Sequence, residues 1–272
     1  MNKVFCGDNL KYMKSLLDEG LAKTIDFIYI DPPFFTESTY KAQVDGEVID
    51  AYSDQWDDLD GYLTMLRERL ALMRELLKDS GSIIIHADWH AVHYIKVMAD
   101  EIFGRKNFIN EIIWSYKSGG ASKKSFARKH DTLLLYGKTS KYYFNPQKEV
   151  SYNRGFKPYR FKGVQEYCDS EGKWYTLVNH KDIISTDMVG RTSKERNGYA
   201  TQKPMALIKI LLESCCPEGG TAADFFGGSG TLAEAAAASG RNFIICDEQV
   251  LAIDITKKRL DAIGAEYEYS EE

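Results

Sequence analysis

Residues 25–34 have the sequence IDFIYIDPPF, which predicts a buried strand followed by a rigid turn at a binding edge. Its first six residues are mostly β-branched or aromatic, which favours a buried strand, and two prolines end it. In an open α/β sheet, ligands bind beyond the carboxyl ends of the strands, so Asp31 stands at a predicted binding edge. A carboxylate acceptor followed by a stacking ring, Phe34, suits a flat amino-bearing ring such as a nucleobase. The same residues also fit a plain strand end with a surface aspartate.

A second stretch, TAADFFGGSGT at residues 221–231, has the layout of a nucleotide-type cofactor site. It predicts a strand, a tight glycine loop and a helix, and a further strand at 242–246 ends at Asp247. Glycines let a ligand approach the backbone, and an acid about 20 residues further on can bind ribose hydroxyls. The glycine loop alone also fits a nicotinamide or flavin enzyme. A tight turn that binds no ligand is a further alternative. Asp247 could also be an ordinary strand-end residue.

Composition predicts a globular chain of one large domain, or one domain with an insert. The chain has 272 residues, of which 44% are hydrophobic and 28% charged. It has no apolar run long enough to span a bilayer and no signal peptide, so we expect no membrane association. Its five cysteines are irregularly spaced, which suggests free thiols in a reducing, cytoplasmic location.

Charge is unevenly distributed along the sequence. The net charge is -5, yet residues 112–200 contain 17 Lys and Arg against 8 Asp and Glu. Such asymmetry suggests a basic, anion-facing segment on an acidic body. A solvated basic loop is the alternative.

Strand-like and helix-like segments alternate, which predicts an α/β sheet with helices on both faces. Strands are expected at 4–6, 25–30, 82–85, 110–114, 131–136, 221–226 and 242–246. Helices are expected at 10–17, 61–78, 89–103, 204–215, 231–239 and 250–263. Residues 35–60 are expected to form a long loop. Residues 138–197 mix basic and aromatic side chains, and we interpret them as an inserted subdomain between two parts of one domain, 1–137 and 198–272.

The two stretches together resemble the S-adenosylmethionine-dependent DNA amino-methyltransferases. The catalytic DPPF motif precedes the FGGSG cofactor motif, an order that resembles the beta group, which includes the modification subunits of type III restriction systems. Further segments similar to that family are GDNL at 7–10, QWDD at 55–58, NEIIW at 110–114, KERNGY at 194–199 and TQKP at 201–204. The resemblance implies a Rossmann-like methyltransferase sheet with circularly permuted motifs.

The resemblance also implies roles for individual residues. The catalytic residues that would hold the target base are Asp31, Pro32, Pro33 and Phe34. The cofactor-binding residues would be Asp8, Thr201, Gln202, Lys203, Asp224, Phe226, Gly228, Gly230 and Asp247. The resemblance implies that Asp8 forms a hydrogen bond with the adenine amino group of S-adenosylmethionine, although it could instead cap a helix. The family often has Tyr where this chain has Phe34, which keeps the stacking face and loses the hydroxyl.

The expected reaction is methylation of adenine N6 in double-stranded DNA, because an aspartate at the first motif position favours adenine in this family. The alternatives are cytosine N4, RNA adenine, and a DNA-binding subunit with a vestigial cofactor site. The basic segment 138–197 matches the family's target-recognition position, and the loop at 117–129 is expected to touch the DNA backbone. A homodimer and a separate restriction subunit are further expected partners.

Three histidines, His86, His90 and His93, together with Asp88, have a spacing that resembles a metal site. They fall where a strand passes into a helix, and no second carboxylate cluster accompanies them. Local capping and surface packing explain them better, so we expect no metal.

Overall fold

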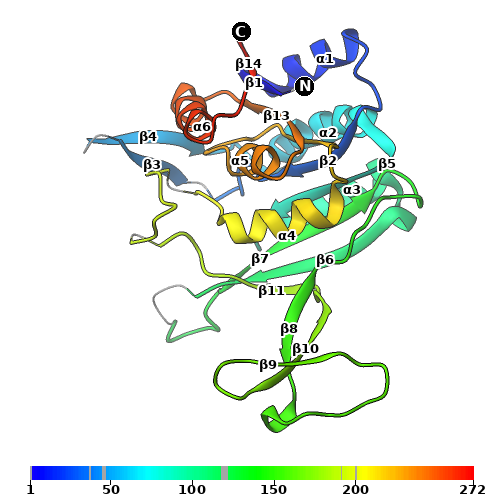
Figure 1. Cartoon of the computed structure of the whole chain (residues 1–272). Helices are drawn as coiled ribbons and strands as arrows, with labels where there is room; N and C mark the ends of the chain where they lie inside the picture. The colour runs from blue at the N-terminus through cyan, green and yellow to red at the C-terminus, as the bar shows by residue number, and fades with distance from the viewer. Residues whose placement is uncertain (1, 37, 45–46, 118–121, 191, 200) are drawn as a thin grey trace.

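The structure is a computed structural model of the chain that describes residues 2–36, 38–44, 47–117, 122–190, 192–199 and 201–272 (Figure 1). Gly119 and Gly120 of the predicted DNA-contacting loop lie outside the described residues. Within the described part of the chain, no helix is both long and apolar enough to cross a membrane.

In the described chain, the centre of the molecule is a nine-stranded sheet of order β11-β6-β7-β5-β2-β12-β13-β1-β14. Strand β7 runs antiparallel to both of its neighbours, while the other pairings are parallel. The bounds of these strands are β1 Lys3–Cys6, β2 Ile25–Ile30, β5 Leu77–Ala87, β6 Phe108–Ser115, β7 His130–Gly137, β11 Ile183–Ser185, β12 Thr221–Asp224, β13 Asn242–Asp247 and β14 Glu268–Glu271.

Helices cover both faces of this sheet (Figure 1). One face packs against α1 Asn9–Asp18, α2 Leu59–Leu76 and α3 Val92–Ala99. The other face packs against α4 Met205–Cys215, α5 Thr231–Ala238 and α6 Val250–Ala262. Two-sided cover confirms the predicted α/β class with helices on both faces.

Strand β2 lies at the centre of the sheet, and every one of its residues is therefore buried. Ile28 faces the cluster formed with α1 and α2, and Tyr29 faces the cluster formed with α4. A parallel strand buried on both faces reads as a nearly continuous apolar run. The sheet therefore places Asp31, the next residue, at its carboxyl edge.

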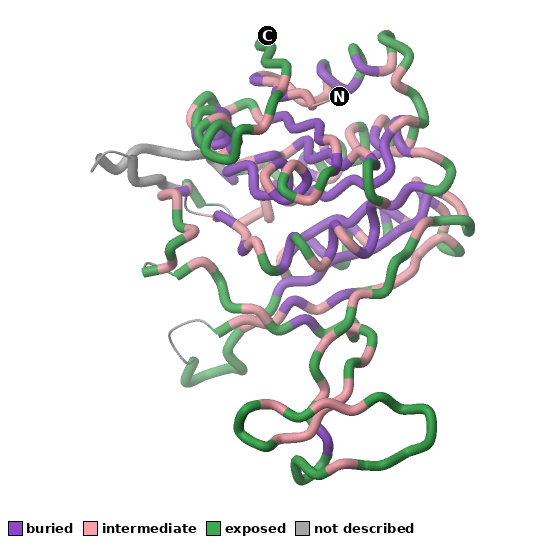
Figure 2. Tube along the Cα trace, viewed as in Figure 1, coloured by how far each residue is buried: buried purple, intermediate pink, exposed green. Residues whose placement is uncertain are grey.

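A small antiparallel sheet lies apart from the central one, at the foot of the molecule in Figure 1. Its strands are β8 Lys148–Tyr152, β9 Glu166–Cys168 and β10 Trp174–Asn179, in the order β8-β10-β9. Figure 2 shows that this part of the chain is largely exposed. The short strand β11, inside the predicted insert 138–197, pairs with β6 of the central sheet. The division into domains and the permuted motif order stay predictions.

The structure corrects two expected elements. Residues 35–60 contain an antiparallel ribbon, β3 Ser38–Val44 with β4 Glu47–Asp54, where the sequence predicted a loop. The overlooked signal was the dipeptide Asp-Gly at 45–46, a strong hairpin turn former. Helix α3 begins at Val92 rather than Trp89, because Asp88 caps the backbone N–H of His90 in a turn before the helix.

Candidate active site

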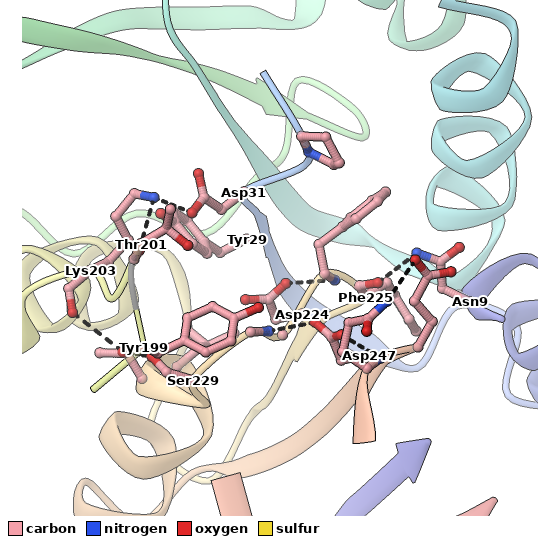
Figure 3. A pocket seen from close by; sticks show the side chains of 18 of the residues that line it. Asn9, Tyr29, Asp31, Tyr199, Thr201, Lys203, Asp224, Phe225, Ser229 and Asp247 are labelled. Carbon is pink, nitrogen blue, oxygen red and sulfur yellow. Dashed lines mark hydrogen bonds and ion pairs between the residues drawn. The ribbon is translucent and has the colours of Figure 1, made fainter. Parts of the chain in front are cut away.

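Asp31 follows β2 directly, and its two carboxylate oxygens have different surroundings (Figure 3). Oδ2 forms an ion pair with Lys203, a residue 172 positions away. Oδ1 is buried and has no hydrogen-bond donor among the described residues, and the Nδ1 of His86 lies 3.7 Å from it. A buried acceptor without a donor is costly. Oδ1 is therefore suited to accept a hydrogen bond from an incoming N–H group.

The turn after Asp31 is held by Asp54, which sequence reasoning missed. The fully buried Asp54 carboxylate accepts backbone N–H groups from Phe34 at 3.0 Å, Phe35 at 3.0 Å and Thr36 at 2.8 Å. It also accepts the indole N–H of Trp56 at 3.0 Å. Phe35 has a φ of 63°, a strained value for a side chain of this size. Asp54 thus stabilises an otherwise unfavourable backbone conformation next to the DPPF motif.

The rest of the DPPF motif lies beside Asp31, and of its three residues only Pro33 lines the cavity next to Asp31. Pro32 is buried, and the carbonyl of Pro33 accepts the hydroxyl of Tyr62 at 2.7 Å. The Phe34 ring lies 5.6 Å from the ring of His86, and the Nζ of Lys203 lies 5.4 Å from the Phe34 ring centre. Phe34 is thus placed beside the same ammonium that pairs with Asp31.

A cavity of about 280 Å³ connects Asp31 with the glycine loop. Its walls come from both halves of the chain, and Tyr199 is one of the residues that line it (Figure 3). We call the part around Asp31 and Lys203 the Asp31 end, and the part around residues 224–231 and Asp247 the glycine-loop end. Of the predicted residues, the cavity is lined by Asp31, Pro33, Thr201, Lys203, Asp224, Phe226, Gly228 and Asp247.

Two carboxylates at the glycine-loop end accept backbone N–H groups. Asp224 accepts from Phe226 at 2.9 Å, and Asp247 accepts from Gly228 at 2.8 Å and from Gln249 at 2.9 Å. Burial raises the pKa of Asp247 to about 6 and raises that of Asp224 well above its ordinary value. Asp247 ties the glycine loop to the end of β13 and keeps lone pairs for hydroxyl donors in the cavity.

Two glycines of the loop have different reasons to lack a side chain. Gly228 has a φ of 49° and lines the cavity. Gly230 has a φ of 73°, and a Cβ placed there would lie 2.5 Å from the hydroxyl of Thr256. Gly230 is not part of the cavity wall, so its role is to let α5 pack against α6.

Besides Gly230, two predicted cofactor residues lie outside the cavity wall. Asp8 caps α1 by accepting the N–H of Lys11 at 2.9 Å and pairs with Arg69 at 3.1 Å, while its neighbour Asn9 lines the cavity. Gln202 is buried, accepts the N–H of Asn197 at 3.0 Å and donates to the carbonyl of Glu195 at 2.7 Å. Gln202 therefore braces the segment that carries Tyr199 and Lys203.

The histidines near the end of β5 do not cluster. His90 pairs with Asp88 at 2.7 Å, as local capping predicts. His86 is fully buried, so the expected surface packing is wrong for this residue, which instead belongs to an internal hydrogen-bond network. Within the described residues, no group of three or more His, Cys, Asp or Glu side chains could hold a metal ion.

Comparison with known proteins gives the family. Residues 25–258 match the family model described as DNA methylase, of the N6 and N4 type. The chain belongs to this family. The match covers both ends of the cavity and the segment between them.

Curated relatives align with this chain over nearly its whole length. The type II methyltransferase M.EcaI of Enterobacter cloacae is 29% identical over 97% of this chain and 70% of the relative. The DNA adenine methyltransferase YhdJ of Escherichia coli is 27% identical over 94% of this chain and 81% of the relative.

Solved structures share the fold. One is the complex of M1.HpyAVI with SAM, with a TM-score of 0.62 at 18% identity over 96% of this chain and all of that one. Another is the DNA modification methylase TTHA0409 of Thermus thermophilus with S-adenosyl-L-methionine, with a TM-score of 0.65 at 16% identity over all of this chain and 98% of that one. These similarities confirm the predicted methyltransferase fold.

Proposed function

We propose that this chain transfers a methyl group from S-adenosylmethionine to the N6 amino group of an adenine in double-stranded DNA. The observation that carries the proposal is the unpartnered Oδ1 of Asp31 at one end of a cavity whose other end holds Asp247. Family membership supplies the reaction class. Among the relatives, YhdJ is named an adenine methyltransferase.

The glycine-loop end fits S-adenosylmethionine. The carboxylates of Asp224, which is buried, and Asp247, which is half-buried, offer acceptors for hydroxyl and amino groups, and Phe226 and Tyr199 offer apolar faces. The cofactor supplies a methyl group on a positively charged sulfur. Acceptors of this kind, set at the ends of neighbouring parallel strands, are the usual way an α/β sheet binds a nucleoside.

The Asp31 end fits an amino-bearing base. Such a base must leave the duplex to reach the cavity. Oδ1 of Asp31 would accept one amino hydrogen, and the neighbouring Pro32 carbonyl the other. Both bonds favour a pyramidal nitrogen with an available lone pair, and Phe34 would stack on the ring. The carboxylate would then receive the proton that the nitrogen releases.

Positioning and electrostatics would account for most of the acceleration. Lys203 places a positive charge beside the Asp31 carboxylate, and Asp54 fixes the turn that carries Phe34. The side chains at this end are therefore oriented before substrate arrives. A cytosine-N4 enzyme, the PvuII methyltransferase, shares the fold with a TM-score of 0.63, so the fold alone does not choose the base.

Basic and aromatic side chains near the carboxyl edge of the sheet support DNA as the substrate. The guanidinium of Arg128 lies 3.7 Å over the ring of Trp89, and Phe126 on the same loop is 99% exposed. Exposed aromatics of the small sheet and its loops are Tyr152, Phe156, Tyr159 and Phe161. We propose that segment 138–197 reads the target sequence.

A homodimer and a separate restriction subunit are proposed partners. The Mod subunit of the type III enzyme StyLTI is a 24% identical relative.

The test is methylation-sensitive sequencing of DNA from cells that express the wild-type chain or Asp31→Ala. We expect N6-methyladenine in one short motif with the wild type and none with Asp31→Ala. Asp57→Ala, which removes an exposed carboxylate outside the cavity wall, is the matched control and should methylate like the wild type.

Titration with S-adenosylmethionine should show that Asp31→Ala still binds the cofactor, since Asp31 belongs to the other end of the cavity. N4-methylcytosine in place of N6-methyladenine would keep the mechanism and overturn the base assignment. Folded wild-type protein that binds the cofactor and modifies no DNA would refute the proposed substrate.

A further inference from the structure

A row of buried polar side chains crosses four neighbouring strands behind Asp31. Tyr29 lies on β2, His86 on β5 and Asp131 on β7, while Tyr116 follows the end of β6. His86 is fully buried, Tyr29 is 2% exposed and Asp131 is 9% exposed. Polar groups this deep in a core are expensive unless all of them are paired, and a fully paired network fixes one arrangement of its members.

The hydrogen bonds of this row converge on the carboxylate of Asp131. Tyr116 donates its hydroxyl to Oδ1 of Asp131 at 2.9 Å, and Nε2 of His86 lies 3.1 Å from Oδ2 of the same carboxylate. Nδ1 of His86 lies 2.7 Å from the hydroxyl oxygen of Tyr29. The Asp131 carboxylate only accepts hydrogen bonds, so Nε2 is the donor of its bond to His86, and Nδ1 of the neutral imidazole is the acceptor for the hydroxyl of Tyr29. The His86 proton then resides on Nε2, where it is donated to Asp131.

His86 contacts both sides of the catalytic turn. Tyr29 precedes Asp31 by two residues, and the Phe34 ring, three residues after Asp31, lies 5.6 Å from the His86 ring. Trp114 supports the imidazole from behind, with a ring distance of 5.6 Å and an interplanar angle of 85°. The orientation of one imidazole thus determines where the residues before and after Asp31 can lie.

We propose that His86 and Asp131 are a buried positioning pair that holds the Asp31 to Phe34 turn in the geometry that receives the target base. The proposal rests on the proposed function and adds two residues to it. Neither residue lines the cavity, so both act through Tyr29, Phe34 and Asp31. The Asp131 carboxylate selects the tautomer of His86 that can accept from Tyr29.

Asp131→Asn is the decisive variant because it keeps the shape of the side chain. An amide can donate to Nε2, which moves the ring proton to Nδ1 and removes the acceptor for Tyr29. We expect kcat to fall on the order of 10²-fold, the loss that follows when a reacting group is misplaced by about 1 Å. The KM for DNA and the Kd for S-adenosylmethionine should stay within about twofold of the wild type, because neither residue touches the cavity.

Two further variants separate positioning from packing. Tyr29→Phe keeps the ring and removes the hydroxyl, and should lower kcat on the order of tenfold, the equivalent of one hydrogen bond. Tyr136→Phe is the matched control: Tyr136 is a buried tyrosine of β7 that donates to Asp100 at 2.8 Å, on the face of the sheet opposite His86. It should lose stability and keep the wild-type kcat.

Thermal unfolding establishes that each variant is folded. The proposal is overturned if folded Asp131→Asn and Tyr29→Phe both methylate DNA at the wild-type rate, or if Tyr136→Phe loses as much kcat as they do. A wild-type chain that methylates no DNA refutes the proposed function instead, so the two failures are distinguishable.

Discussion

The two ends of the cavity are built differently. At the glycine-loop end, Asp224 and Asp247 accept backbone N–H groups from residues close to them in sequence or in the loop that follows the adjacent strand β12. At the Asp31 end, the carboxylate meets side chains from distant segments, Lys203 and His86. Local backbone geometry therefore defines the glycine-loop end, whereas long-range packing defines the Asp31 end.

This difference predicts different consequences of mutation. A change at the glycine-loop end should act on folding and cofactor affinity, because the loop and the strands beside it share their hydrogen bonds. A change at the Asp31 end should act on the rate, because those side chains orient a reacting group without supporting the sheet.

Gly230→Ala should have the largest effect. The new Cβ would meet three atoms of Thr256 at 2.5 to 2.9 Å, on a backbone with a φ of 73°. Strain and overpacking together should lower the free energy of unfolding by about 3 kcal/mol, measured by urea denaturation. Gly240→Ala, at the other end of α5, is the control: its φ is 68° and nothing lies within 4 Å, so only backbone strain of about 1 kcal/mol applies. Equal losses in the two variants would contradict the packing role of Gly230.

Lys203→Met should have the next largest effect, and on the rate. Asp31 would lose the charged hydrogen bond that orients it, which is worth about 2 kcal/mol, so kcat should fall about 30-fold in a steady-state methylation assay. Lys78→Met breaks a similar pair with Asp26 near the other end of β2, where Nζ lies 2.8 Å from both oxygens. This control should lose stability at an unchanged kcat. Equal losses of kcat in the two variants would contradict the specific effect of the Asp31 end on the rate.

The smallest predicted effect is a pH dependence at Asp247. Cofactor affinity should weaken as pH falls through about 6, roughly tenfold per pH unit below it, because protonation removes an acceptor. The cofactor-free chain should respond in the opposite sense. Since burial raises the native pKa above an unfolded value of about 4, the native state takes up the proton first, and this group adds stability as pH falls from about 6 towards 4.

Titrations and melts between pH 5 and 8 measure both responses. Asp247→Asn serves as the control, because position 247 cannot titrate in it and its cofactor affinity should lose the fall near pH 6 that belongs to this residue. Asp224, whose pKa is also raised by burial, would leave a residual dependence in the melts of that variant. A wild-type affinity that is flat from pH 5 to 8 would show that ionised Asp247 is not needed for binding.

Much of the framework was predictable because it rests on local patterns. The buried run 25–30 forms β2 as predicted, and the glycine loop separates β12 from α5. The ribbon β3–β4 was missed because residues 35–60 have only a weak hydrophobic periodicity, and the pairing of two strands is not visible in the order of residues. Asp8 was predicted either to bind the cofactor or to cap a helix. The structure shows the capping contact, and an aspartate between a strand and a helix fits both predictions in the sequence.

The sequence by itself determined the α/β class, the family and the two motifs, since each depends on neighbouring residues whose order is visible in the chain. Only the tertiary structure revealed what surrounds Asp31. Lys203, Asp54 and His86 reach the turn after Asp31 because the fold brings three separate segments to the carboxyl edge of β2. A buried carboxylate is oriented by whichever donors the fold places beside it, and that placement depends on packing across the whole molecule.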